Sequence, residues 1–288
     1  MKKGYIFIVA LLVFILPWAS GRADTDRCYE AVKQGKYQDA IAICTKQIEN
    51  GFFNDKSIAA SYRQRGIAYL ATGKTDLAIA DLDRAIELDN NDASAYANRG
   101  AAYLSQRKFY LAIGDFDKAI ELNPRDDIAY KNRGVCYMSK GKLDRAIVDF
   151  SKALELNPKD DETYNDRGAT YLEQGKTDLA IADFSEAIQL NPKNDEPYRN
   201  RSAAHMKAGR FEVAKADLSK AIELNPADSR GYYNMACLYS LKKNVMESCS
   251  WLQKAIDHGY NNWQQMKQDS DLENVRSADC YKKISKGK

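Results

Sequence analysis

Apolar residues recur every three to four positions through most of the chain, in paired stretches on either side of a short polar segment. This spacing gathers apolar side chains on one face of an α-helix. In four copies the polar segment contains a glycine, which permits the tight turn that follows a helix: Gly73, Gly141, Gly175 and Gly209. Each pair of stretches therefore predicts a helix, a turn and a second, antiparallel helix.

The pattern repeats with a period of 34 residues in six units, from residue 59 to residue 262. The motif Tyr-x-x-Arg-Gly starts at Tyr62, Tyr96, Tyr130 and Tyr164. The fifth copy keeps Arg201 but loses the glycine, and the sixth loses both residues. A fixed period of this length is typical of stacked helix pairs that share a continuous core.

Capping residues precede the predicted first helices at the same spacing. Their side-chain oxygens can accept hydrogen bonds from the free N–H groups of the first helical turn. They are Asp92, Asp126, Asp160, Asn194 and Asp228. These positions support the predicted helix boundaries.

These residues resemble the tetratricopeptide repeat motif. In the first full unit the motif comprises Tyr62, Gly66, Tyr69, Ala78, Leu82 and Ala85. The resemblance implies an all-α fold, a right-handed superhelical solenoid of helix-turn-helix repeats over residues 59–262. Residues 24–58 are expected to form a divergent hairpin of the same kind, with a longer loop around residues 50–57 that exposes Phe52 and Phe53. Residues 263–288 are expected to form a polar capping helix and tail.

Five arginines stand where the family usually has leucine, and each is followed 16 residues later by an aspartate. The sixth unit has Met235 and Trp251 at these two positions. Joint presence and joint loss predict a structural ion pair between the two helices of a unit, because one partner alone would leave a semi-buried charge. The alternative is a charged binding strip. The pairs are Arg65–Asp81, Arg99–Asp115, Arg133–Asp149, Arg167–Asp183 and Arg201–Asp217.

The resemblance also implies that the first helices line the concave surface, where this family usually binds its partners. One row on these helices consists mostly of amides: Gln64, Asn98, Asn132, Asp166, Asn200 and Asn234. Such a row presents donors and acceptors to the main chain of an extended peptide. The alternative is that asparagine at this position stabilises the repeat itself.

Two neighbouring rows are expected to give the groove its selectivity. One row comprises Arg63, Lys131, Asn165, Arg199 and Tyr233, and the other Leu70, Leu104, Met138, Leu172 and Met206. Cations beside an apolar strip favour an extended segment with acidic and apolar side chains, or an amphipathic helix. Against this, the fourth and fifth units are locally acidic, with Glu162, Asp166, Glu173 and Glu196. The methionines are also consistent with ordinary packing.

The cysteines are expected to form two disulfides within hairpins. Residues equidistant from the turn of an antiparallel pair lie opposite each other. The first predicted turn places Cys28 opposite Cys44, and the last brings Cys237 near Cys249. Cys280 is expected to be free or to compete for Cys249. These pairings require Cα atoms within about 7 Å of each other.

No catalytic or metal-binding motif stands out in the sequence. Its two histidines, His205 and His258, are 53 residues apart, and it has neither Cys-x-x-Cys nor a glycine-rich phosphate loop. Cys136 is expected to be a buried thiol. We therefore expect no catalytic residue, no metal and no cofactor. The alternative is a thiol-active envelope enzyme that works through Cys136 or Cys280.

Residues 1–23 have the basic start, apolar run and small residues of a cleaved export signal. The apolar run is shorter than the roughly 20 residues that span a membrane, which favours cleavage over an uncleaved anchor. Loss of Lys2, Lys3 and Arg22 lowers the number of Lys and Arg from 43 to 40, equal to the 40 Asp and Glu. A neutral chain argues against nucleic acid as a partner.

The sequence thus predicts a non-catalytic exported scaffold or adaptor that binds a protein or extended peptide in its concave groove, in envelope assembly or secretion. The expected location is the bacterial periplasm. Secretion, or tethering to the inner membrane by an uncleaved leader, is the alternative. We expect a monomer, with no direct membrane binding once the leader is cleaved.

Overall fold

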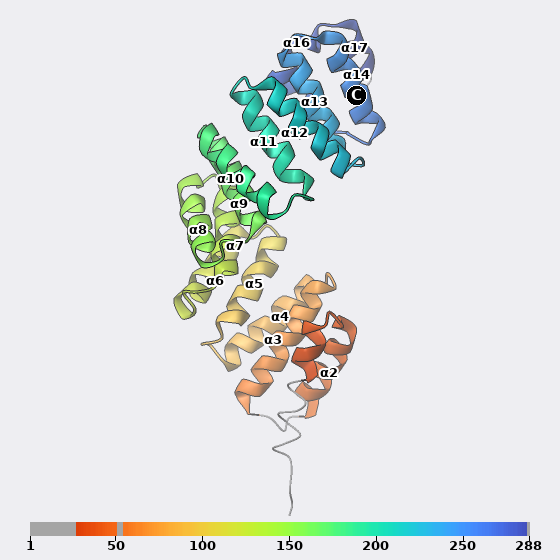
Figure 1. The fold of residues 1–288 in the computed structure, drawn as a ribbon. Helices are drawn as coiled ribbons and strands as arrows, with labels where there is room; N and C mark the ends of the chain where they lie inside the picture. The colour runs from red at the N-terminus through yellow and green to blue at the C-terminus, as the bar shows by residue number, and fades with distance from the viewer. Residues whose placement is uncertain (1–26, 51–53, 287–288) are drawn as a thin grey trace, which may run out of the picture. The chain divides into compact units, whose positions relative to one another are not determined.

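The computed structural model describes residues 27–50 and 54–286, and this part of the chain is helical and contains no strand. The predicted export signal and the predicted exposure of Phe52 and Phe53 lie outside the described residues. The chain divides into two compact units, Met1–Pro124 and Arg125–Lys288. Within each unit, successive helices form antiparallel pairs (Figure 1). No described helix is both long and apolar enough to cross a membrane.

The first unit starts with a helical segment at residues 27–33, which packs against the next helix through Ala31 and Ala40. The helices that follow are α2 (Tyr37–Asn50), α3 (Asp55–Ala71), α4 (Thr75–Leu88), α5 (Ala93–Ser105) and α6 (Phe109–Leu122). α3 begins inside the segment predicted as a loop, because the Asn54 side chain accepts a hydrogen bond from the N–H of Ser57 and caps the helix.

The second unit continues the array with four more pairs and a cluster of short helices. The pairs are α7 (Asp127–Ser139) with α8 (Leu143–Leu156), α9 (Asp161–Glu173) with α10 (Thr177–Leu190), α11 (Asp195–Lys207) with α12 (Phe211–Leu224), and α13 (Ser229–Leu241) with α14 (Val245–Asp257). The short helices are α15 (Trp263–Gln268), the 3-10 helix η1 (Ser270–Leu272), α16 (Glu273–Arg276) and α17 (Asp279–Ser285).

The C-terminal cap is therefore not the single polar helix that the sequence suggests. The Asp269 side chain accepts a hydrogen bond from the N–H of Asp271 and starts a new helical turn, which interrupts the helix. Met266, Leu272 and Val275 are fully buried in the core that the cap shares with α13 and α14. The cap has a polar exterior and an apolar interior.

The two helices of a pair approach closely at one glycine. An added Cβ at Gly100, Gly134 or Gly168 would lie 2.8 Å from a buried phenylalanine ring of the second helix. These rings belong to Phe116, Phe150 and Phe184. The small residue on the first helix therefore makes room for the large residue on the second.

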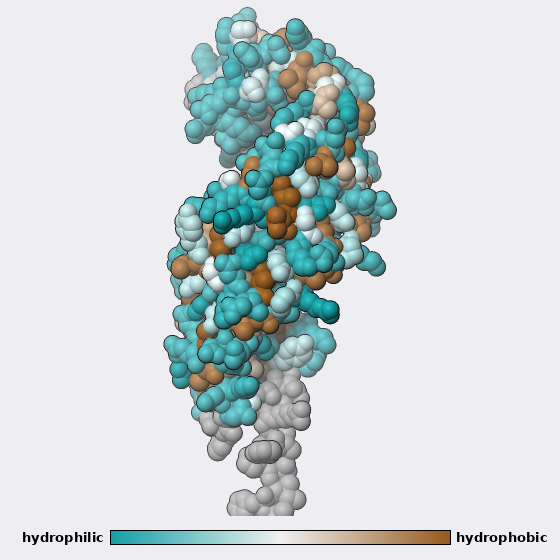
Figure 2. Space-filling view, turned by 90° about the vertical axis from the view of Figure 1, so that its left-hand side faces the viewer, coloured by the Kyte–Doolittle hydropathy of each residue, from teal (hydrophilic) through white to brown (hydrophobic). Residues whose placement is uncertain are grey.

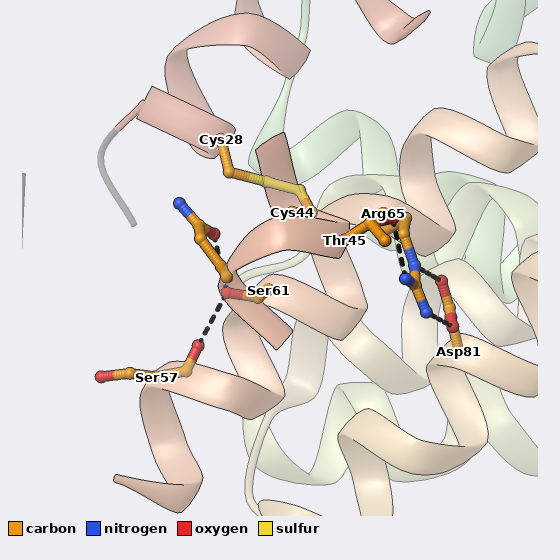
Figure 3. The surroundings of a disulfide bond; sticks show 8 residues. Cys28, Cys44, Thr45, Ser57, Ser61, Arg65 and Asp81 are labelled. Carbon is orange, nitrogen blue, oxygen red and sulfur yellow. Dashed lines mark hydrogen bonds and ion pairs between the residues drawn. A yellow bond between two sulfur atoms is a disulfide. The ribbon is translucent and has the colours of Figure 1, made fainter. Parts of the chain in front are cut away.

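The first disulfide joins Cys28 to Cys44, whose Cα atoms lie 5.5 Å apart. It ties the helical segment 27–33 to α2 (Figure 3). This is the pairing predicted from the hairpin.

The predicted disulfide between Cys237 and Cys249 is wrong. Cys249 of α14 instead bonds Cys280 of α17, with Cα atoms 6.0 Å apart. Cys237 is a buried thiol that donates toward Oδ2 of Asp269 at 3.9 Å. Hairpin geometry identifies neighbours only within one pair, whereas α17 returns to α14 from outside the pair and supplies Cys280.

Candidate binding face

The predicted arginines form bidentate ion pairs with the second helix of their own pair. Nε and Nη2 of Arg65 donate to the two carboxylate oxygens of Asp81, both at 2.7 Å (Figure 3). These hydrogen bonds outweigh burial and raise the pKa of Arg65. The tyrosines one turn before and after, Tyr62 and Tyr69, place their ring centroids 5.4 and 5.9 Å from the guanidinium carbon. The same bidentate bonds join Arg99–Asp115, Arg133–Asp149, Arg167–Asp183 and Arg201–Asp217.

Four of these arginines also bond the preceding helix pair, which sequence reasoning missed. Nη1 of Arg99 donates to Asp83 at 2.6 Å, and Nη1 of Arg167 donates to Ser151 at 3.1 Å. The acceptors for Arg65 and Arg201 are Thr45 and Ser185. Each acceptor has a hydroxyl or carboxylate oxygen, a signal that was present in the sequence. These four arginines therefore connect three helices, and the aspartates of all five ion pairs are buried.

In the second unit the first helices α7, α9, α11 and α13 contact one another in succession. These four helices expose side chains on a shared surface, which we call the inner face. It is the candidate binding face, and it contains four members of the predicted amide row: Asn132, Asp166, Asn200 and Asn234. The two remaining members lie in the first unit.

The amide row is not uniform. Gln64 is buried, Asn98 Nδ2 donates to the main-chain oxygen of Ser94 at 2.7 Å, and Asn200 Nδ2 donates to Asn165 at 2.9 Å. Asn132 and Asn234 are half-exposed, and their amides form no hydrogen bond within the described residues. Of the row, these two amides are the ones best placed to meet a ligand.

The cations of the neighbouring row are already occupied by carboxylates. Nη1 of Arg63 donates to both carboxylate oxygens of Asp92 at 2.8 and 2.9 Å. Lys131 Nζ lies 3.2 Å from Asp160 Oδ2 and 2.6 Å from Glu162 Oε2. Asp92 and Asp160 each cap the first helix of the next pair. These cations therefore link neighbouring repeats.

Burial alone would lower the pKa of Lys131, but the hydrogen bond to Glu162 and the attraction of Asp160 raise it. The next cation of the row, Arg199, makes longer contacts. Its Nη1 lies 3.7 Å from Oδ2 of Asp228, which caps α13. Tyr233 follows in the row and donates to Oδ2 of Asp269 at 2.7 Å.

Asp166 differs from its neighbours in the row because it is a half-buried carboxylate without a hydrogen bond to its side chain within the described residues. Burial raises its pKa to about 7; Lys131 opposes this rise, while Glu196 and Glu162 add to it. Its charge is thus only partly compensated at neutral pH.

In the apolar row Met206 is buried, whereas Leu70, Leu104, Met138 and Leu172 are half-exposed. Met206 is 7% exposed and packs against Ala214 and Leu218, as the packing alternative predicts. Met138 accepts a hydrogen bond from the Thr170 hydroxyl at 3.3 Å. Over the view in Figure 2, hydrophobic side chains lie in small groups among hydrophilic ones.

The described residues contain no group of His, Cys, Asp or Glu that could hold a metal ion. Burial raises the pKa of Cys136 to about 11. Cys280 is in a disulfide. His205 is buried, which lowers its pKa, and its Nε2 lies 4.0 Å from Asp217. The buried, largely protonated thiol of Cys136 is therefore a poor nucleophile.

Models of the tetratricopeptide repeat match residues 93–126, 128–160, 162–194, 195–228 and 218–250, and a further repeat model matches residues 66–106. Together the matches run almost without a gap from residue 66 to residue 250. The chain belongs to the tetratricopeptide repeat family. No curated protein matched the sequence.

Solved structures of other tetratricopeptide repeat proteins show the same fold. The crystal structure of YrrB, a protein with an unusual peptide-binding site, shares 23% identity over 66% of this chain and 96% of YrrB, with a TM-score of 0.56. A tetratricopeptide repeat protein from Parabacteroides merdae shares 20% identity over 89% of this chain and 98% of its own, with a TM-score of 0.64. The pilF protein of Pseudomonas aeruginosa shares 19% identity over 75% of this chain and 99% of its own, with a TM-score of 0.63.

Proposed function

We propose that this tetratricopeptide repeat protein is a non-catalytic exported scaffold that binds an extended segment of a partner protein on the inner face of its second unit. The observation that carries the proposal is the pair of half-exposed amides, Asn132 and Asn234, on a face whose other polar groups are largely bonded to one another. Free amides offer both a donor and an acceptor to a peptide main chain. Peptide binding by YrrB, a protein of the same fold, supports the same reading.

The disulfides support a location outside the reducing cytoplasm. Two pairs of cysteines are bonded in the described residues, Cys28–Cys44 and Cys249–Cys280, and structural disulfides persist in oxidising compartments such as the bacterial periplasm. Together with the export signal expected at residues 1–23, this supports a periplasmic role in envelope assembly or secretion. Mass analysis of the N-terminus of the mature protein tests this part: a start near residue 24 supports cleavage, and a start at Met1 supports a membrane-tethered scaffold.

The binding face is tested by cross-linking in the exported fraction, followed by mass spectrometry and by titration of the purified partner. We compare the wild type with Asn132→Ala/Asn234→Ala and with Gln189→Ala, which removes an exposed amide from the second helix α10. Loss of about two hydrogen bonds is expected to weaken partner binding about tenfold in the double variant. The Gln189→Ala control is expected to bind as the wild type does.

Circular dichroism and thermal melting verify that the variants are folded. A partner that binds the double variant and the wild type with equal affinity would contradict the proposed face. A substrate that the purified protein converts, with activity lost in Cys136→Ser, would contradict the non-catalytic assignment.

A further inference from the structure

The inner face of the second unit is anionic, in line with the local acidity of the fourth and fifth units and not with the cation row. Carboxylates from α9, α11 and the caps before α9 and α13 outnumber the cations of the same surface. The carboxylates are Asp160, Glu162, Asp166, Asp195, Glu196 and Asp228, and the cations are Lys131, Arg199 and Arg230. We call this set the anionic patch. Its formal charge is three units negative when all its members are ionised.

Four of these charges act on the pKa of Asp166. Glu162, one turn before it on α9, Asp160 in the cap of α9 and Glu196 on α11 raise this pKa, and Lys131 on α7 lowers it. Lys131 is hydrogen-bonded to Glu162 at 2.6 Å and lies 3.2 Å from Asp160. These two carboxylates therefore already compensate part of the positive charge that could stabilise ionised Asp166. An ionised, half-buried carboxylate without a bonded cation is costly, and either a proton or a bound cation relieves this cost.

Arg199 supplies a second, independent observation. It is 5% exposed, and its Nη1 makes no hydrogen bond within the described residues. The nearest carboxylate oxygens, on Asp195 and Asp228, lie 3.8 and 3.7 Å away, and its Nη2 lies 3.8 Å from Glu196. Buried donors normally have a partner at hydrogen-bond distance. Arg199 thus comes no closer than 3.7 Å to these carboxylates and compensates their charge only from a distance.

We propose that the anionic patch binds a basic, extended segment of a partner protein, with a lysine or arginine side chain at Asp166 and main-chain groups toward Asn132. The segment's positive charge is complementary to the patch. The inference rests on the proposed function and specifies its ligand: the acidic segment suggested by the cation row is disfavoured, because Lys131 is already paired.

Fluorescence anisotropy with defined peptides tests the charge preference. The probe is a fluorescein-labelled nonapeptide of alternating alanine and lysine with blocked ends, and the controls have glutamine or glutamate in place of lysine. The purified protein is expected to bind the lysine probe at least tenfold more tightly than the glutamine peptide, and to bind the glutamate peptide least. The preference is expected to weaken as salt rises, because exposed charges are screened.

Single substitutions identify the carboxylates that cause the preference for a positively charged peptide. Asp166→Asn installs the amide found at Asn132 and Asn200, so the fold is expected to be retained. Loss of a half-buried carboxylate partner is expected to weaken binding of the lysine probe about tenfold and to leave binding of the glutamine peptide unchanged. Glu196→Gln, at a more exposed position, is expected to cost about twofold. Glu186→Gln removes an exposed carboxylate from α10 as the matched control and is expected to have no effect.

The pH dependence provides a readout that a structural role of Asp166 would not give. A bound cation favours ionised Asp166, whose pKa in the free protein is about 7, so binding below this pH first requires loss of a proton. The affinity of the lysine probe is therefore expected to rise about tenfold from pH 6 to pH 8 in the wild type and to stay flat in Asp166→Asn.

Two results would overturn the inference: equal binding of the lysine and glutamine peptides, or an unchanged preference in Asp166→Asn together with Glu196→Gln. Failure of the inference differs from failure of the proposed function. If the glutamine peptide binds as tightly as the lysine peptide, and Asn132→Ala/Asn234→Ala abolishes this binding, then the proposed binding face is correct and the charge preference is wrong. If none of the peptides binds and the natural partner binds elsewhere, both are wrong.

Discussion

The internal helix pairs and the last pair solve the same packing problem with different chemistry. In α3, α5, α9 and α11, the first helix of the pair presents an arginine to a buried aspartate of its partner helix and to a polar residue of the preceding pair. In α13 and α14 the two positions are Met235, which is 2% exposed, and Trp251, both packed in one apolar cluster. The ion pair is thus replaced by apolar side chains in the pair that contacts the C-terminal cap.

The comparison extends to the ends of the described chain. The last pair is covered by short helices instead of another repeat, and the disulfide Cys249–Cys280 holds α17 against α14. The disulfide Cys28–Cys44 closes the first hairpin in the same way. Terminal units of a solenoid lack one neighbour, and their lost interface must be replaced by other contacts. Here the replacement is an apolar core and a covalent bond.

The largest effect is expected from breaking one internal ion pair. Asp183→Leu leaves Arg167, whose side chain is 19% exposed, without its bidentate partner. An uncompensated, largely buried charge is expected to cost about 4 kcal/mol of unfolding free energy. Urea unfolding followed by circular dichroism measures the change.

The apolar last pair supplies the matched control for this variant. Arg167→Met/Asp183→Leu removes both charges and imitates the chemistry of Met235, so it is expected to recover most of the loss and to lie within about 1 kcal/mol of the wild type. A double variant no more stable than Asp183→Leu would show that the ion pair does more than compensate its own charge.

A second prediction concerns the disulfide of the cap. Cys249→Ser/Cys280→Ser removes the bond and prevents Cys249 from pairing with Cys237. Opening a crosslink between residues 31 positions apart is expected to cost the cap about 3 kcal/mol. Limited proteolysis that cuts α15–α17 faster in the variant than in the wild type measures this loss, and peptide mapping of the wild type checks that Cys237 is a free thiol.

The repeats were predictable and their ends were not, for a physical reason. The period, the capping residues and the Arg–Asp pairs recur, so a prediction made for one copy can be checked against the others. The pair Arg65–Asp81, for example, supports the pair Arg99–Asp115. The cap occurs once: nothing in the spacing shows that Asp269 interrupts the last helix or that α17 brings Cys280 to Cys249. The sequence left the charge of the inner face open, with a cation row beside locally acidic units, because it does not show that carboxylates of the next repeat pair with Lys131.

The smallest effect is expected where the two regions differ by a methyl group. Gly134→Ala would place a Cβ 2.8 Å from the Phe150 ring, and overpacking is expected to cost about 2 kcal/mol. The last pair has Ala236 in the glycine row and Leu252, both fully buried, in the phenylalanine row. Gly134→Ala/Phe150→Leu imitates that pair and is expected to be more stable in urea than Gly134→Ala alone. If Gly134→Ala/Phe150→Leu is less stable than Gly134→Ala, then this helix pair requires the phenylalanine ring itself, and the last pair is stabilised by other contacts.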